Sequence, residues 1–208
     1  DRVYEIGRIF RNEGIDSSHS AEFTMLEAYE SWGDQFSIAM MTQRLVQNAA
    51  DALGSRVIDT PAGEIDLDGE WPWKPVYPTL AAALGEEITP ATPAPVLQAI
   101  ARAHDIEFDP AWGAQKLVQT LFGDLVEPTL LQPTFVCDYP PIAQPLARPH
   151  RHDENLIEAW DLIIGGVERG TGFSELVDPV IQRERLVAQS VKAAAGDLEA
   201  MQLDEDFL

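Results

Sequence analysis

The sequence is short of cysteine and has no long apolar run. Its single cysteine, Cys137, excludes an internal disulfide and a zinc site built from several cysteines, and it fits a reducing cytoplasm. No apolar run reaches the roughly eighteen residues that a membrane-spanning helix needs. The first residues lack a methionine, a basic region and a cleavage site, so we expect no signal peptide there but a start within an element already under way.

Basic residues are also scarce. The chain has 14 Lys and Arg against 35 Asp and Glu, a formal net charge of −21. Nucleic-acid binding takes much of its affinity from Lys and Arg on phosphates, so we expect this chain to bind tRNA poorly by itself. The 208 residues, 45% of them hydrophobic, exclude a disordered polymer and predict a domain of mixed class with a substantial core.

Two strands, 2–13 and 22–30, are predicted at the start of the chain, joined by a polar loop. Because side chains alternate along a strand, one face should be apolar, with Tyr4, Ile6, Phe10, Leu26 and Ala28. The opposite face should carry Arg11, Glu13, Phe23, Glu27 and Tyr29. That face is either a solvated surface whose charges pair or a platform for a planar, charged ligand. Mixed charges beside aromatic rings favour the ligand platform.

The middle of the chain is predicted to be mostly helical, and the end returns to strands and a helix. Helical periodicity and stop signals predict helices over 36–53, 80–84, 96–104, 114–126 and 179–195, the last capped by Asp178. Strand patterns predict a small hairpin over 56–67, an irregular edge segment at 71–75, a buried strand beginning at Pro133 and a strand over 159–167. The polar run 147–155 is predicted to be a solvated loop. Its His150 and His152 lack a third ligand, so they are weak evidence for a metal site.

Two blocks of sequence carry a family resemblance. Phe10-Arg-Asn-Glu-Gly14, His19, Glu22-Phe-Thr-Met-Leu-Glu27 and Tyr29 resemble motif 2 of the class II aminoacyl-tRNA synthetases, and the lysyl enzymes of actinobacterial type most closely. The run from Trp160 to Pro179 resembles a later strand of the same catalytic domain. The resemblance implies an α+β fold, an antiparallel sheet flanked by helices. Motif 2 and its helix would occupy 1–53, a mostly helical insertion 54–128, and later strands and a helix 129–208.

The activity implied by this resemblance is ATP-dependent activation of L-lysine to lysyl-adenylate, followed by transfer to tRNA(Lys). ATP would be a substrate and Mg²⁺ the metal. The family pattern implies that Arg11 bridges the lysine carboxylate and the α-phosphate, and that Glu13 accepts a hydrogen bond from adenine. It also implies that His19 meets the β- or γ-phosphate and that Phe23 stacks on adenine. Asp161 and Glu168 match the positions that hold Mg²⁺, although the family usually has glutamate in place of Asp161.

Lysine itself would be held by Glu27, Tyr29 and Glu175, with Phe173 as a wall and Thr171 where the family usually has asparagine. A hydrated ammonium group needs carboxylates to replace its water. Glu168 and Glu175 are seven residues apart, which would place them on opposite faces of an ideal strand. Gly170 and Gly172 between them permit a bulge that would bring both carboxylates to one side.

The resemblance also implies parts that the 208 residues lack. Motif 1, motif 3 and the anticodon-binding barrel would lie outside, so we expect an inactive or impaired piece of a homodimeric parent. Three alternatives stay open. They are a paralogue that lysylates a translation factor, a bifunctional synthetase linked to lipid lysylation, and a non-catalytic lysine- or nucleotide-binding module.

Overall fold

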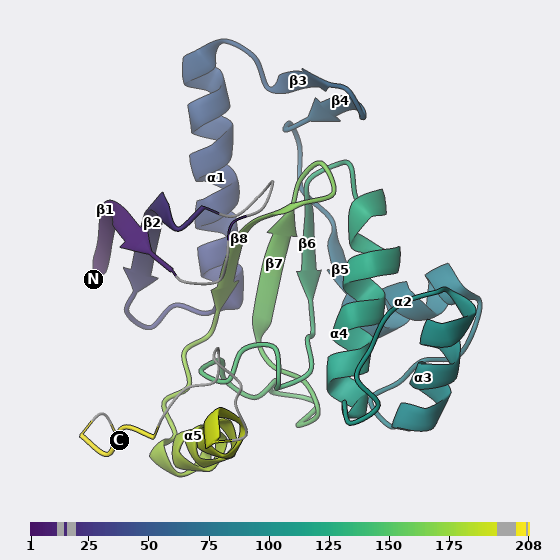
Figure 1. The fold of residues 1–208 in the computed structure, drawn as a ribbon. Helices are drawn as coiled ribbons and strands as arrows, with labels where there is room; N and C mark the ends of the chain where they lie inside the picture. The colour runs from purple at the N-terminus through teal and green to yellow at the C-terminus, as the bar shows by residue number, and fades with distance from the viewer. Residues whose placement is uncertain (12–14, 16–19, 195–202, 207) are drawn as a thin grey trace. The chain divides into compact units, whose positions relative to one another are not determined.

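The computed structural model describes residues 1–11, 15, 20–194, 203–206 and 208. Figure 1 shows its helices and strands, coloured by their position along the chain. The chain divides into two compact units, one made of Asp1–Gly33 and Val177–Leu208 and the other of Asp34–Leu176. Among the described residues no helix is both long and apolar enough to cross a membrane.

The first unit contains a two-stranded hairpin and a helix. Strand β1 (Arg2–Phe10) pairs antiparallel with β2 (Glu22–Glu30). β1 was predicted to reach Glu13 but ends at Phe10, and the amide of Arg11 donates to the carbonyl of Ala21 (3.1 Å) just beyond it. The pairing of Tyr4 with Ala28 and of Ile6 with Leu26 places the predicted apolar residues on one face. Tyr4, Ile6 and Phe10 on that face are 75%, 61% and 70% exposed.

Helix α5 (Pro179–Ala194) belongs to the same unit and begins as predicted. The side chain of Asp178 accepts hydrogen bonds from the amides of Val180 (2.9 Å) and Ile181 (3.3 Å). These two amides have no carbonyl partner within the helix, so the carboxylate acts as its N-cap. The predicted end of this helix, at residue 195, lies outside the described residues.

The second unit is built on a four-stranded sheet in the order β5-β6-β7-β8. β6 (Thr134–Cys137), β7 (Ala159–Ile163) and β8 (Glu168–Phe173) pair antiparallel, whereas the edge strand β5 (Trp73–Pro75) runs parallel to β6. β7 is shorter than the predicted strand 159–167. Gly165 and Gly166 have φ angles of +70° and +72°, a conformation that turns the chain and ends the strand.

Helices cover the two faces of this sheet (Figure 1). Helix α1 (Gln35–Leu53) packs on the face that carries Trp160 and Leu162. Helices α2 (Val76–Leu84), α3 (Ala94–Ala103) and α4 (Ala114–Leu125) form the second core with side chains of the opposite face. The three helices of the region predicted as an insertion therefore pack against the sheet. It also contains a hairpin of β3 (Val57–Thr60) and β4 (Gly63–Asp66), and its last two residues belong to the short helix η1 (Glu127–Thr129).

Helix α1 has strong signals at both ends. The Asp34 carboxylate accepts hydrogen bonds from the amides of Phe36 (3.0 Å) and Ser37 (3.1 Å), which forms an N-cap. Gly54 ends the helix with φ +89°, a left-handed conformation that glycine adopts without strain. The two signals fix the ends of α1.

Candidate active site

The hairpin of the first unit presents the predicted ligand face. Cross-strand pairing of Ile9 with Phe23 and of Val3 with Tyr29 places both rings on one face, and Arg11 has the same parity as Ile9. The Arg11 guanidinium lies 5.6 Å from the centre of the Phe23 ring, within cation–π distance. The geometry agrees with the predicted grouping. Glu13 and His19, assigned to the same ligand, lie outside the described residues.

Two glutamates oppose each other on this face. Glu5 pairs directly with Glu27 across the strands, an arrangement of like charges that destabilises a hairpin in water. Ion pairs form on the opposite face instead, between Arg2 and Glu30 (2.7 Å) and between Arg8 and Glu22 (3.4 Å). A cationic ligand would relieve the repulsion between Glu5 and Glu27. The alternation of side chains along the strand could have identified Glu5 from the sequence, but the residues of the family pattern include only Glu27.

The second unit confirms the predicted bulge. Asp161 pairs with Thr171, but Ile163 pairs with Glu168, and the register shifts between Leu162 and Ile163. Because β8 has one extra residue at this point, the part of β8 that precedes it points its side chains to the opposite face from the one that regular alternation would give. Glu168 therefore shares a face with Asp161, Thr171 and Phe173. An uninterrupted strand would have turned it away.

Asp161 lies in a strongly desolvated position. Burial raises the pKa of its carboxyl group, although hydrogen bonds with Thr171 and Tyr139 partly oppose the shift. Tyr139 is itself buried, and burial next to Asp161 raises the pKa of its hydroxyl, so that the hydroxyl stays protonated and donates to the carboxylate. An anion held in this way has lost much of its hydration, and a bound cation would compensate for that loss.

Glu127 adds a third carboxylate near this position. Burial and the nearby Asp161 raise the pKa of Glu127, while a hydrogen bond from the backbone amide of Glu168 opposes the shift. Glu127 was not predicted as a site residue because it precedes β6 by several positions and belongs to neither of the two sequence blocks that resemble the family. No three His, Cys, Asp or Glu side chains in the described part of the chain are placed to hold a metal by themselves. Two carboxylates are nevertheless compatible with Mg²⁺, which usually keeps waters and shares substrate phosphates.

Glu175 follows β8 at the solvent boundary. Its side chain is exposed at the surface, and partial burial raises the pKa of its carboxyl group. Its backbone forms an isolated antiparallel bridge with Ala147, and the Arg148 side chain donates to its carbonyl oxygen (Nε to O, 3.2 Å). The polar run 147–155, predicted to be a solvated loop, is thus anchored to the segment that carries Glu175.

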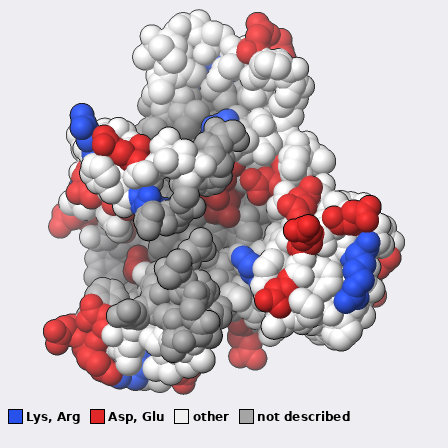
Figure 2. Space-filling view, viewed as in Figure 1, with Lys and Arg blue, Asp and Glu red and all other residues white. Residues whose placement is uncertain are grey.

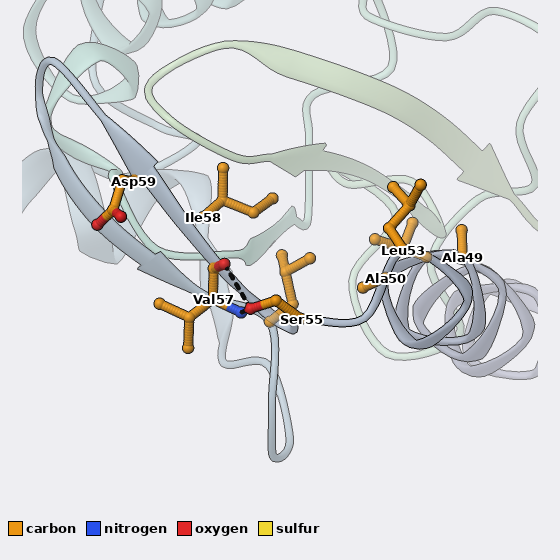
Figure 3. A pocket seen from close by; sticks show the side chains of 9 residues that line it. Ala49, Ala50, Leu53, Ser55, Val57, Ile58 and Asp59 are labelled. Atoms are coloured by element: carbon orange, nitrogen blue, oxygen red, sulfur yellow. Dashed lines mark hydrogen bonds between the residues drawn. The ribbon is translucent and has the colours of Figure 1, made fainter.

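Acidic side chains outnumber basic ones in the sequence, 35 against 14. Asp and Glu cover more of the face shown in Figure 2 than Lys and Arg do. Figure 3 shows an apolar groove between the end of α1 and β3. Leu53, Val57 and Ile58 line it, and Ser55 bonds to the backbone of Val57 at its rim. It contains none of the predicted site residues.

The replacement Asp161→Asn is expected to stabilise the ligand-free chain near neutral pH. Because the folded state raises the pKa of this carboxyl group, it binds the proton more tightly than the unfolded chain does. The resulting stability is present at pH values below the unfolded pKa and is lost as the pH rises through the folded pKa. Asparagine keeps the shape and carries no charge. Urea unfolding at pH 5 and pH 8 should show the variant gaining over the parent chain as the pH rises, and equal pH dependence of the two proteins would contradict this account.

Sequence comparison places these features in a family. The family described as tRNA synthetases class II (D, K and N) matches residues 1–208. The chain therefore belongs to the class II tRNA synthetases of this group.

Individual relatives are more specific. The chain is 53% identical to a lysine–tRNA ligase of Mycolicibacterium gilvum and 51% identical to a lysine–tRNA ligase of Kineococcus radiotolerans, in each case over 100% of this chain and 42% of the relative. It is 44% identical to the lysylphosphatidylglycerol biosynthesis bifunctional protein LysX of Rhodococcus opacus, of which it covers 19%. The chain thus spans less than half the length of these curated relatives.

Proposed function

We propose that this chain carries nucleotide- and lysine-binding parts of a lysine–tRNA ligase, which activates L-lysine with ATP and transfers the lysyl group to tRNA(Lys). The observation that carries the proposal is the hairpin face on which the Arg11 guanidinium lies over Phe23. The same face bears Glu27 and Tyr29. The names of the relatives at 53% and 51% identity support the same activity.

Adenylate formation needs alignment rather than a protein nucleophile. A carboxylate oxygen of lysine bonds to the α-phosphorus of ATP, and the bond to the bridging oxygen breaks, so that pyrophosphate leaves with the electron pair. A ribose hydroxyl of tRNA then takes the lysyl group and AMP is released. Arg11 would contact both anions through its planar fork, offset their repulsion and stabilise charge on the α-phosphate. Phe23 would stack on adenine, Glu13 would accept from its amino group, and His19 would meet the β- or γ-phosphate.

Lysine would be selected by its charge and its length. Glu27 and Glu175 would replace the water around its ammonium group, and Tyr29 would contribute a hydroxyl. Thr171 and Phe173, both in β8, would contact the rest of the substrate. Thr171 also bonds to the carbonyl oxygen of Trp160 (3.2 Å), which limits the rotation of its hydroxyl.

Asp161 and Glu168 would hold Mg²⁺. Their hard oxygen atoms fit this ion, and the desolvation of Asp161 favours a bound cation over an exposed charge. When bound there, the ion supplies positive charge to the phosphates of ATP. The Tyr139 hydroxyl would keep the Asp161 carboxylate in place through its hydrogen bond. The single cysteine, which fits a reducing compartment, supports a cytoplasmic location for the activity.

A lysine-dependent ATP–pyrophosphate exchange assay tests the proposal. The full-length protein that carries this chain should exchange labelled pyrophosphate into ATP when lysine and Mg²⁺ are present, and ornithine should support the exchange far less well. The same protein should charge tRNA(Lys). Absence of stimulation by lysine would overturn the proposal.

The 208-residue chain assayed in parallel should be inactive or severely impaired. It spans 42% of its lysine–tRNA ligase relatives, and we propose that a γ-phosphate contact, a homodimer interface and a basic tRNA-binding surface come from other segments. Calorimetry with lysine and with ATP distinguishes a non-catalytic module, which binds either ligand without forming adenylate even in the full-length protein.

A second candidate function follows from the LysX relative. Its name describes lysylphosphatidylglycerol biosynthesis, so the same lysyl-activating chemistry could feed the lysylation of a lipid. The adenylation step and its residues would be unchanged. Expression of the full-length gene followed by lipid extraction separates the two, because only the bifunctional protein yields lysylated phosphatidylglycerol.

A further inference from the structure

A closed set of backbone hydrogen bonds lies where β8 ends. The amide of Arg148 donates to the carbonyl of Ser174 (2.7 Å), the amide of Ser174 to that of Glu158 (2.9 Å), and the amide of Glu158 to that of Arg148 (2.9 Å). These hydrogen bonds join three separate segments of the chain in a triangle. We call these three residues, together with Arg151, the anchor.

A buried carboxylate lies within the anchor. Glu158 is only 1% exposed, and the Arg151 guanidinium donates to both of its oxygens. Burial by itself would raise the pKa of Glu158, but the hydrogen bonds from Arg151 and Ser174 outweigh it and lower the pKa. Glu158 is therefore an ionised, buried carboxylate whose partner Arg151 is about half exposed, and removal of Arg151 would leave that buried charge without its ion-pair partner.

The anchor also reaches the start of α1. Arg151 lies 3.5 Å from the N-cap carboxylate of Asp34, and the Ser174 hydroxyl accepts a hydrogen bond from the amide of Gln35 (3.0 Å). Arg151 therefore contacts both Glu158 and Asp34, and Ser174 accepts from Gln35 through its hydroxyl and from Arg148 through its carbonyl oxygen. Such a network fixes mutual positions more narrowly than apolar packing, because its hydrogen bonds weaken when atoms shift by a few tenths of an ångström.

Glu175 lies directly beside this network. Arg148 bonds to the carbonyl oxygen of Glu175 through its side chain and to that of Ser174 through its amide. On the other side, the amide of Leu176 donates to the carbonyl of Leu146 (2.9 Å). The backbone on both sides of Glu175 is therefore fixed by the segment that Glu158 and Arg151 hold in place.

We propose that Glu158 and Arg151 are positioning residues that set the place of Glu175, and with it the selection of lysine. The inference rests on the proposed function, since it assigns to Glu175 the ammonium group of the substrate. Neither residue touches substrate in this account. Their effect passes through Arg148 and Ser174 to the backbone of Glu175.

The test uses Glu158→Gln and Arg151→Met in the full-length protein. Arg56→Met is the matched control, because Arg56 also pairs with two carboxylates, Asp51 (2.7 Å) and Asp68 (2.7 Å), in the same unit. The KM for lysine should rise on the order of 10- to 100-fold in the two anchor variants, with the KM for ATP unchanged. Arg56→Met should leave both constants unchanged.

Hydrogen exchange supplies the second readout. The amides of Arg148, Glu158 and Ser174 should exchange faster in both anchor variants than in the control. Faster exchange with an unchanged KM for lysine, or equal increases in the KM values for lysine and ATP, would overturn the positioning role and leave a purely structural one. If Arg151→Met does not fold, Ser174→Ala removes the side-chain link while keeping the ion pair, and an unchanged KM for lysine in that variant would likewise overturn the inference.

The two hypotheses fail in different ways. An unaltered protein without lysine-dependent exchange overturns the proposed function, and the positioning of Glu175 for lysine is overturned with it, while the amide exchange rates still report on the anchor itself. In the other case, the parent protein and the Arg56→Met control are both active, and the anchor variants keep the parental KM for lysine. That result overturns the positioning inference but not the proposed function.

Discussion

Replacing Arg11 by lysine is expected to lower the kcat of lysine-dependent ATP–pyrophosphate exchange roughly 100- to 1,000-fold. Lysine keeps the positive charge but loses the planar fork, so it can act on only one of the two reacting anions at a time. It also loses the flat contact with Phe23, over which the Arg11 guanidinium lies at 5.6 Å. The loss should appear mainly in kcat, because the contact with the α-phosphate strengthens as charge develops there.

The same hairpin provides a matched control. Arg8 lies on the opposite face, where it pairs with Glu22 at 3.4 Å and is largely exposed. Arg8→Lys makes the same chemical change three residues away, and the exposed pair is worth little in stability. Steady-state exchange kinetics should therefore separate the two variants. An Arg8→Lys variant as impaired as Arg11→Lys, or an Arg11→Lys variant with parental kcat, would contradict the role given to Arg11.

Much of the fold could be predicted because its signals are local. The parity of the first strands, the stop at Gly54 and the cap at Asp178 each depend on a few neighbouring residues, and all three agree with the structure. A bulge in β8 was predicted because Gly170 and Gly172 permit one between Glu168 and Glu175. The structure shows a register shift between Glu168 and Gly170, whereas Gly172 pairs regularly with Trp160, and the placement of Glu175 on the side of Glu168 stays a prediction.

The rest depended on contacts between distant segments. Nothing in the run 147–155 indicates that Arg151 pairs with Glu158 or that Ala147 pairs with Glu175, since both pairings exist only once the sheet has formed. Glu127 likewise approaches Asp161 through the packing of η1 near β7 and β8. The parallel pairing of β5 with β6 could not be predicted from the sequence, because β5 has only three residues and ends in a proline.

Gly172 is a further position whose meaning appears only in three dimensions. A Cβ atom placed there would lie 2.3 Å from Cζ2 of Trp160, far inside contact distance. Trp160 cannot move aside easily, because it is 1% exposed, lies against Phe135 with ring centres 5.0 Å apart, and donates from Nε1 to the carbonyl of Gln35 (2.8 Å). From the sequence, Gly172 was interpreted only as a residue that permits a bulge. In the structure, the lack of a side chain at Gly172 leaves the space that the Trp160 ring occupies.

The replacement Gly172→Ala is therefore expected to lower the free energy of unfolding by about 3 kcal/mol, the upper part of the usual range for overpacking a core. Gly170→Ala is the matched control in the same strand, since nothing lies within 4 Å of a Cβ there. Both changes restrict the unfolded chain equally, so the difference between them isolates the clash. Urea unfolding followed by tryptophan fluorescence measures both.

A double-mutant cycle identifies the cause. Trp160→Phe removes the outer ring that the new methyl group would meet, so Gly172→Ala should cost less in that background, with a coupling energy of about 1–3 kcal/mol. The Trp160 indole also links β7 to the first residue of α1, so part of the loss in Gly172→Ala should appear as faster hydrogen exchange at the start of that helix. A cost that is the same with tryptophan or phenylalanine at position 160 would show that the methyl group acts through the backbone of β8 and not through the ring.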